Sequence, residues 1–300
     1  MSGQVAVRFK IKAEISPENQ LQQLIEQHYP AVKTAGFHLS PVAGLTGESW
    51  KIASPAGDML ARHQSGERRN AGVERQREHA ILRRIARQSL GPCVRLSSPP
   101  WLLVEWIAGV PLSEAAFVSV QGQKFVSGSL AKLHRLACSG YPLDLRRQFA
   151  RYWQHIDRRR LTPRWLALHQ KMIRRKLPVP LKMALLHMDI HAGNLLETEK
   201  GVRIIDWEYA ADGDIALEFA ALFRGNGLDP LQQDAFLREY AEAGGYQDLP
   251  LFRQQIKRWL PWVDYLMLLW FEVRLAQTAD KKYSEWAQPL RVRLFGRVHD

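Results

Sequence analysis

The chain has 300 residues, 46% of them hydrophobic, so it can bury one large core or two smaller ones, and a two-lobed globular protein is expected. The two cysteines, Cys93 and Cys138, lie far apart in no metal-ligand or redox spacing, which argues against a disulfide framework and fits a reducing compartment. The formal net charge of +12 favours an anionic partner, but no nucleic-acid-binding module or zinc spacing accompanies the basic clusters. Solvated helix faces explain most of these clusters.

Strands and helices are both expected before residue 90. Ser16 is a typical N-cap and Pro17 a typical first helical residue, so a helix is expected from Pro17 to about His28. Residues 37–64 contain two short apolar runs around a turn, which predict a pair of strands. Residues 73–86 follow helical spacing.

A second strand pair and a long helical region come next. The segment CVRLSSPPWLLVEWIAG predicts two strands, the second from Trp101 to Ile107. From Phe117 onward the sequence predicts mostly helices. The break near residues 107–112 is the expected boundary between two lobes. The expected division is an N-terminal extension, a nucleotide-binding lobe and a catalytic and substrate-binding lobe, at residues 1–15, 16–107 and 108–300.

Two segments bear on localisation. The start, MSGQVAVRFKIKAEIS, alternates apolar and basic residues instead of placing a charged start before a long apolar run, so it is a poor secretion signal. The late apolar stretch WLPWVDYLMLLWFEV is cut by Asp264 and Glu272 and is shorter than the roughly 20 residues that a membrane span needs. We therefore expect a cytoplasmic protein without a membrane partner.

The stretch LLHMDIHAGNLLETEKGVRIIDWEYAADGD interrupts the helical region and carries most of the candidate chemistry. Its apolar runs predict two strands that end at polar residues, so Asp189, Asn194 and Asp206 can converge at one edge. Two aspartates and an asparagine suit Mg²⁺, a hard cation that takes oxygen ligands and usually keeps water and substrate phosphates. If one carboxylate stays free to orient a hydroxyl nucleophile, the arrangement predicts phosphoryl transfer.

These residues also carry a resemblance to a known family. The sequence from His187 to Asn194, HMDIHAGN, resembles the H-x-D-x-x-x-x-N catalytic loop of the protein-kinase-like fold, and Asp206 lies where the aspartate of D-F-G would be. Together with the segment GDIALEFA, these two motifs are similar to the aminoglycoside phosphotransferase and choline kinase superfamily. Together with RWLPW and WFEVRLAQTAD they are most similar to its bacterial thiamine kinases.

The resemblance implies a fold, a reaction and partners. The fold would be α+β and bilobal, with a small, mostly antiparallel β N-lobe that carries helices and a larger, mainly helical C-lobe. The reaction would be Mg²⁺-dependent phosphorylation of the hydroxyethyl group of thiamine by ATP. Choline, an aminoglycoside or homoserine is the alternative acceptor. The partners would be these small molecules, with no nucleic acid, and we expect a monomer.

The resemblance assigns roles in the second lobe. Asp189 would accept or orient the proton of the attacking hydroxyl, while Asn194 and Asp206 would hold Mg²⁺ against the ATP phosphates. His187 is expected to pack behind the loop as a scaffold. His191 would contact the transferred phosphate, although an ordinary loop histidine explains it equally well.

The first lobe departs from the family pattern at one position. Gly44 and Gly47 would let backbone amides approach the phosphates, although a plain hairpin turn accounts for them as well. The usual lysine of the following strand is missing, and Arg62 stands in its place, either as a phosphate ligand or as a solvated strand end. Its acidic partner would be Glu78, with Glu74 as the competitor.

The resemblance places two further sets of residues. Backbone groups of Glu105 and Ile107 would meet the adenine edge. The cationic, flat acceptor calls for aromatic faces and a carboxylate, which are also the residue types of ordinary cores and salt bridges. The candidates in the second lobe are Trp207, Glu208, Trp262, Asp264, Trp270 and Glu272. Asp214 and Glu218 are expected to anchor a loop and a helix.

Two other function classes fit parts of the sequence. A metallohydrolase could use His187, Asp189 and His191 as metal ligands, because H-x-D-x-H spacing occurs in such sites. This hypothesis leaves Asn194 and the whole first lobe without a role. A basic nucleic-acid-binding protein would explain the charge, and its binding would fall steeply with salt.

Overall fold

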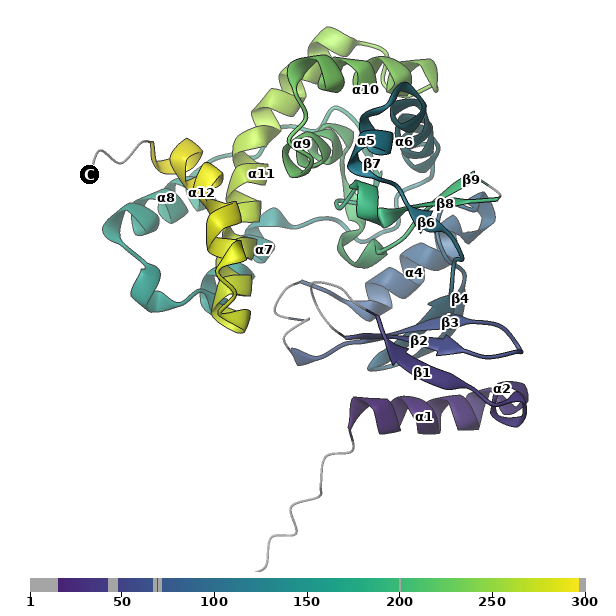
Figure 1. The fold of residues 1–300 in the computed structure, drawn as a ribbon. Helices are drawn as coiled ribbons and strands as arrows, with labels where there is room; N and C mark the ends of the chain where they lie inside the picture. Colours follow the sequence, from purple (N-terminus) through teal and green to yellow (C-terminus); the bar gives the residue numbers. More distant parts are fainter. Residues whose placement is uncertain (1–15, 43–47, 67–68, 70–71, 200, 297–300) are drawn as a thin grey trace, which may run out of the picture.

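A computed structural model describes residues 16–42, 48–66, 69, 72–199 and 201–296. Figure 1 shows a smaller part that contains a β-sheet and a larger, mainly helical part. This arrangement is the α+β, two-part architecture that the sequence predicts.

The smaller part is built around a sheet that has five antiparallel strands in the described residues, in the order β1-β2-β3-β5-β4. Its strands are β1 (His38–Pro41), β2 (Ser49–Ala53), β3 (Met59–His63), β4 (Val94–Ser98) and β5 (Trp101–Glu105). Both expected strand pairs, β2 with β3 and β4 with β5, are confirmed. β5 ends at Glu105 and not at the expected Ile107, because its neighbour β3 begins at Met59, the partner of Glu105.

Two helices cover one face of this sheet, α1 (Pro17–His28) and α2 (Pro30–Ala35). The Ser16 side chain accepts a hydrogen bond from the Asn19 amide at 3.3 Å, so the expected N-cap is confirmed. Apolar side chains of the two helices and the sheet form a small separate core. Its buried members are Leu21, Ile25, Val32, Ile52, Met59, Ala61, Trp101 and Leu103.

Helix α4 (Arg75–Ile85), followed by the 3₁₀ turn η1 (Ala86–Gln88), covers the other face. Its buried residues Ile81 and Leu82 belong to the large core, together with Leu102 and Val104 of β5. Successive strand residues point to opposite faces, so β5 gives Trp101 and Leu103 to the small core and its other apolar residues to the large one. Helix α4 is therefore packed into the same core as the larger part.

The larger part combines helices with short strands. Its helices are α5 (Glu114–Val118), α6 (Val120–Leu133), α7 (Leu145–His155), α8 (Pro163–Arg174), α9 (Ile215–Gly225), α10 (Pro230–Glu242), α11 (Leu249–Thr278) and α12 (Lys282–Phe295). Its strands are β6 (Val110–Pro111), β7 (Met183–Leu186), β8 (Leu195–Thr198), β9 (Gly201–Ile204) and β10 (Ala211–Asp214). Its 3₁₀ turns are η2 (Arg158–Arg160), η3 (Ala192–Asn194) and η4 (Trp207–Tyr209).

The short strands bring the polar motif together. Strand β7 leads directly to His187, β8 pairs with β9 in an antiparallel hairpin, and β9 leads to Asp206. The expectation that strands deliver the two acids is confirmed. Strand β6, which comes earlier in the chain, pairs with β8 of this hairpin, with Val110 opposite Glu197. The division of the chain at residues 107 and 108 stays a prediction.

The long helix α11 runs through the larger part and packs against α7, α9 and α12 (Figure 1). Its buried apolar face includes Trp262 and Leu269, which belong to the large core. Its acids Asp264 and Glu272 are buried and paired with arginines, which explains charges inside an apolar run. Among the described residues, no helix has the length and apolar character that crossing a membrane requires.

Candidate active site

His187 is the scaffold of the loop that follows β7. It is completely buried, and its Nε2 is 3.0 Å from the carbonyl oxygen of Ile205, while its Nδ1 accepts the amide of Asp189 at 3.2 Å. The pKa of His187 is lowered, mainly by burial, so the ring is neutral with its proton on Nε2. Both ring nitrogens are used inside the protein, which agrees with the expected scaffold role.

The side chains of Glu218 and Asn226 also fix the backbone of the loop that follows β7. The Glu218 carboxylate accepts the amides of His187 at 2.6 Å and of Met188 at 2.7 Å. Met188 has a φ of 68°, a left-handed conformation that a non-glycine residue adopts only where its surroundings enforce it. The Asn226 side chain donates to the carbonyl of Ile190 at 2.8 Å. The loop is therefore fixed before any substrate arrives.

Asp214 holds the turn into α9. Its Oδ2 accepts Trp259 Nε1 at 2.7 Å and Gln255 Nε2 at 3.0 Å, and its Oδ1 accepts the Ala216 amide at 3.2 Å. The anchoring roles expected for Asp214 and Glu218 are confirmed.

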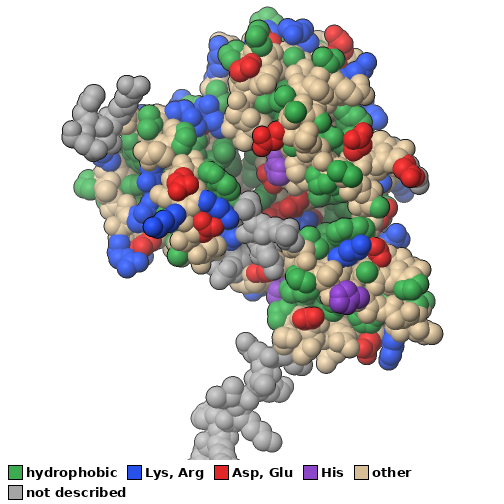
Figure 2. All heavy atoms as spheres, in the orientation of Figure 1, with side chains coloured by type: hydrophobic (Ala, Val, Ile, Leu, Met, Phe, Trp, Pro, Cys, Tyr) green, Lys and Arg blue, Asp and Glu red, His purple; other side chains and the backbone are tan. Residues whose placement is uncertain are grey.

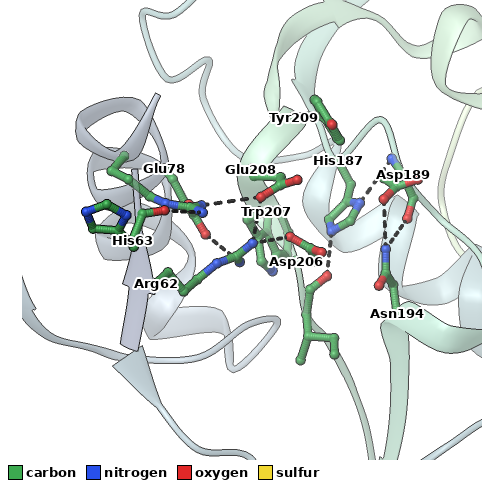
Figure 3. A network of polar contacts seen from close by, with 12 residues as sticks. Arg62, His63, Glu78, His187, Asp189, Asn194, Asp206, Trp207, Glu208 and Tyr209 are labelled. Carbon is green, nitrogen blue, oxygen red and sulfur yellow. Dashed lines mark hydrogen bonds and ion pairs between the residues drawn. The ribbon is translucent and has the colours of Figure 1, made fainter. Parts of the chain in front are cut away.

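Asp189, Asn194 and Asp206 line one cavity, and Figure 3 shows how their side chains lie. Asn194 Nδ2 donates to the Asp189 carbonyl oxygen at 2.9 Å and to its Oδ2 at 3.0 Å. This orientation directs the other atom of the amide, Oδ1, away from Asp189. Asp206 has φ 63° and ψ 62°, a left-handed conformation that is costly for an aspartate and typical of functional sites.

The carboxyl group of Asp189 has the properties of a base near neutral pH. Its side chain is 38% exposed at the bottom of the cavity, within 3.8 Å of His191. Burial raises the pKa of Asp189 to about 8, and the neighbouring carboxylates of Asp206 and Glu208 act in the same direction. With this pKa the group is mostly protonated at neutral pH, and the carboxylate that can accept a hydroxyl proton forms as the pH rises through about 8.

The donor set fits Mg²⁺. Asn194 Oδ1 and the Asp206 carboxylate are the hard oxygen donors that Mg²⁺ prefers, and the Asp206 side chain is 38% exposed. The described part of the chain contains no group of three or more histidine, cysteine, aspartate or glutamate residues that could hold a metal ion. The ligand set of the metallohydrolase hypothesis, His187 with Asp189 and His191, is therefore wrong, because both nitrogens of His187 are already bonded.

His191 is the N-cap of the turn η3. Its Nδ1 accepts the Gly193 amide at 3.1 Å, and its Nε2 lies 3.8 Å from Asp189 Oδ2. Burial lowers the pKa of His191, although Asp206 opposes this shift. The residue lines the cavity beside Asp189, and its contact with a phosphate stays a prediction.

Arg62 is the centre of a buried charge network and not a solvated strand end. Only 6% of the residue is exposed. Its Nη1 donates to Glu78 at 2.7 Å, and its Nη2 donates to Glu208 at 2.8 Å and also to Asp206 (Figure 3). Burial opposes the charge, but the three carboxylates hold the pKa of Arg62 well above its ordinary value. Glu78 is the partner on α4, whereas Glu74 pairs with Arg151.

Glu208 and Trp207 follow Asp206 and have separate environments. Glu208 is 3% exposed and touches the cavity, but its carboxylate is bonded to Arg62 and lies 3.4 Å from Arg75. Trp207 is completely buried against the His187 ring and donates from Nε1 to the Ile204 carbonyl at 2.9 Å. The expected contact between Trp207 and a substrate is wrong, because its ring faces the core.

The cavity has a volume of about 1570 Å³ and extends from the β-sheet to α12. Figure 2 shows a hollow in the middle of this face of the molecule, with acidic side chains inside it. Glu105 and Ile107, the expected adenine contacts, line one end, beside the apolar side chains of Leu60 and Val104. Gly44 and Gly47 lie outside the described residues.

The other end of the cavity is aromatic. Trp270 lines it and donates from Nε1 to the Tyr209 hydroxyl at 3.1 Å. Glu272 does not line the cavity: it is 2% exposed and paired with Arg160 and Arg291, which corrects its expected contact with a substrate.

Two residues at or behind this site, Arg75 and Tyr209, were not predicted from the sequence. Tyr209 stands three residues after Asp206, and this short spacing was the available signal. Arg75 lies in a run of charges that reads as a solvated helix face, although it is 2% exposed. The burial of one arginine among many could not be read from the sequence.

Comparison with known proteins identifies the family. A model described as "Phosphotransferase enzyme family" matches residues 38–253. The chain belongs to this family. Thiamine kinase of Escherichia coli O9:H4 (strain HS) is 35% identical over 210 residues, which cover 70% of this chain and 75% of that protein. Thiamine kinase of Salmonella paratyphi B (strain ATCC BAA-1250 / SPB7) is 33% identical over 266 residues, 88% of this chain and 92% of that protein.

Solved structures confirm the fold. Choline kinase LicA from Streptococcus pneumoniae has a TM-score of 0.72 at 15% identity and covers 93% of this chain and 100% of its own. A choline/ethanolamine kinase family protein from Mesorhizobium loti has a TM-score of 0.69 at 20% identity, with 94% and 95% covered. At these identities the likeness shows the fold alone, which is the expected bilobal, protein-kinase-like one. The chain is a phosphotransferase enzyme that acts on small molecules.

Proposed function

We propose that this enzyme transfers the γ-phosphoryl group of ATP, with Mg²⁺, to the hydroxyethyl oxygen of thiamine, and releases thiamine monophosphate and ADP. The observation that carries the proposal is the convergence of Asp189, Asn194 and Asp206 on one cavity, opposite the Arg62–Glu78 pair. The names of the relatives support thiamine as the acceptor, because two thiamine kinases match at 33% and 35% identity.

The nucleotide would lie between the sheet and the β8–β9 hairpin. Leu60, Val104 and Leu196 offer an apolar slot for the adenine ring, and backbone groups of Glu105 and Ile107 stand at its edge. The phosphates would then extend toward Arg62, which lines the cavity. A planar guanidinium can bind two phosphate oxygens at once, so it can replace the lysine of related kinases.

Asn194 and Asp206 would hold Mg²⁺ through their side-chain oxygens. When bound, the ion would neutralise negative charge on the phosphates. Asn194 is aligned for this task by its two hydrogen bonds to Asp189, and Asp206 by its left-handed backbone.

Asp189 would carry out the proton transfer. The hydroxyl oxygen of the acceptor forms a bond to the γ-phosphorus, the bond from that phosphorus to the bridging oxygen breaks, and ADP leaves with the electron pair. The hydroxyl proton passes to the Asp189 carboxylate, whose pKa of about 8 allows it to accept the proton and return it to water. Because the loop is fixed by Glu218 and His187, little reorganisation is needed to reach this geometry.

The acceptor would occupy the aromatic end of the cavity. Thiamine has a positive thiazolium and a flat pyrimidine, and both suit the faces of Trp270 and Tyr209. Glu285 on α12 also lines this end and can face a positive ring. Choline, homoserine and aminoglycosides share the alcohol group but lack the two flat rings that would fill an aromatic end of this size.

A competition assay tests the proposal. The enzyme receives limiting ATP with Mg²⁺ and equal amounts of thiamine, choline, homoserine and kanamycin, and the products are resolved by mass. Thiamine monophosphate should dominate. Phosphorylation of another alcohol without thiamine monophosphate would keep the kinase and exclude the acceptor, and the absence of any phosphorylated alcohol would contradict the reaction.

A further inference from the structure

Arg75, the first residue of α4, is one of the most buried charged groups of the chain. It is 2% exposed, although the run of charges around it in the sequence predicts a solvated helix face. Its Nη1 donates to Glu78 and lies 3.4 Å from Glu208 Oε2, and its Nη2 donates to the His63 carbonyl at 3.3 Å. Arg75 therefore contacts the same two glutamates that contact Arg62.

The two arginines differ in their access to substrate. Arg62 lines the cavity, whereas Arg75 does not, so Arg75 can influence a ligand only through the groups that it holds. Glu78 offers Oε1 to Arg62 and Oε2 to Arg75, and Glu208 offers Oε2 to both. The glutamates and arginines thus form one closed cluster that joins β3, α4 and η4.

Arg75 brings the charges in this cluster closer to balance, from one guanidinium group against three carboxylates to two against three. Two guanidinium groups face the carboxylates of Glu78 and Glu208, and Asp206 is a third carboxylate, which shares Arg62 and is exposed to the cavity. Without Arg75, three carboxylates would compete for the guanidinium of Arg62. Buried carboxylates strongly oppose the loss of their counter-ion, so Arg62 would be held by them.

We propose that Arg75 is a positioning residue of the nucleotide site: it neutralises Glu78 and Glu208, so that Arg62 can exchange Asp206 for the phosphates of ATP. This inference rests on the proposed function, in which Asp206 turns to Mg²⁺ and Arg62 to the phosphates. Arg75 then leaves Glu78 and Glu208 with a partner throughout the exchange. A purely structural role for Arg75 would predict lower stability without a specific loss of nucleotide affinity.

Calorimetric titration of the full chain with ATP and Mg²⁺ tests this role. Arg75→Met should weaken ATP binding by about tenfold, the size of one hydrogen bond to a charged group, while Arg75→Lys should restore most of the affinity. The KM for thiamine should stay unchanged in both variants. Arg274→Met is the matched control, because Arg274 is a buried arginine outside the cavity, and its ATP affinity should equal that of the wild type.

A second substitution separates positioning from packing. Glu208→Gln in the Arg75→Met background removes one unbalanced carboxylate, so ATP affinity should recover at least about threefold over Arg75→Met alone. Wild-type ATP affinity in Arg75→Met, or no recovery in the double variant, would overturn the proposal. If Arg75→Met does not fold, the double variant is compared with Glu208→Gln alone: equal affinities support the proposal and a tenfold loss overturns it.

The outcomes also distinguish the two proposals. A wild-type chain that binds ATP but leaves thiamine unmodified would contradict the proposed acceptor, and the Arg75 comparison would still be decided by calorimetry. A wild-type chain that does not bind ATP would contradict both.

Discussion

Replacement of Asp189 by asparagine gives the sharpest test of the assigned chemistry. The substitution keeps the shape of the side chain and removes its ability to accept a proton. Asn194 keeps its 2.9 Å hydrogen bond to the carbonyl oxygen of residue 189, so the proposed metal ligand stays in place. The Arg62 network does not include Asp189, and the phosphate side of the cavity is therefore unchanged.

The expected effects on turnover and on binding differ in size. A positioned general base contributes about 10²- to 10⁴-fold, so turnover in Asp189→Asn should fall by at least two orders of magnitude. This loss corresponds to about 2.7 to 5.5 kcal/mol in the activation free energy. Because a pKa of about 8 leaves Asp189 mostly protonated at neutral pH, a neutral asparagine changes the charge beside Asp206 little, and ATP affinity should stay within about threefold of the wild type.

Turnover is measured as thiamine monophosphate formed at saturating ATP, and ATP affinity by calorimetry on the same preparation. Asp157→Asn is the control. Asp157 pairs with Arg159 outside the cavity, so this variant should keep wild-type turnover. If Asp189→Asn retained more than about a tenth of the wild-type rate, the assignment of the base would be refuted, because a base worth less than tenfold is below the usual range.

Substitutions at three further positions test the other parts of the site. Asp206→Ala should abolish the dependence of ATP affinity on Mg²⁺, measured by calorimetry with and without the ion, and a persistent dependence would exclude Asp206 as a ligand. Arg62→Ala should raise the KM for ATP far more than that for thiamine, and Arg62→Lys should recover part of the loss; an unchanged KM for ATP in Arg62→Ala would leave Arg62 a purely structural role. Trp270→Ala should raise the KM for thiamine by roughly threefold to thirtyfold, the range of a cation–π contact, with the KM for ATP unchanged; equal thiamine kinetics in Trp270→Ala and wild type would place the acceptor elsewhere.

Features with local causes could be predicted from the sequence. The N-cap at Ser16 and the β2–β3 and β4–β5 hairpins depend on residues close to one another in the chain. The loop from His187 to Asn194 also contains most of its own determinants, since His187 holds the Asp189 amide and Asn194 holds the Asp189 carbonyl. Short-range hydrogen bonds leave a short-range pattern, which is why these interpretations agree with the structure.

Burial of individual charged residues could not be predicted in this way. Arg62 is buried because Asp206 and Glu208, 144 and 146 residues later in the chain, meet it across the cavity. Trp207 and Glu208 are neighbours in the sequence, yet the indole packs on His187 in the core while the carboxylate faces Arg62. The direction of each side chain is set by the turn η4 and by packing between distant elements, neither of which leaves a local signal.

The two departures from the kinase pattern in this chain account for each other. Arg62 stands where a lysine is usual, and Glu208 stands where the glycine of D-F-G is usual. A glutamate at 208 adds a buried carboxylate beside Glu78 and Asp206, and a lysine ammonium, a compact point charge, is poorly suited to bridging all three. The fork of a guanidinium can serve several acceptors, as Arg62 does through Nη1 and Nη2. The extra carboxylate in turn needs a second cation out of reach of substrate, which is the place that Arg75 occupies. The arginine, the glutamate and the second arginine are therefore best understood as one coupled change, and substituting any one of them alone should be more costly than the loss of its own contacts.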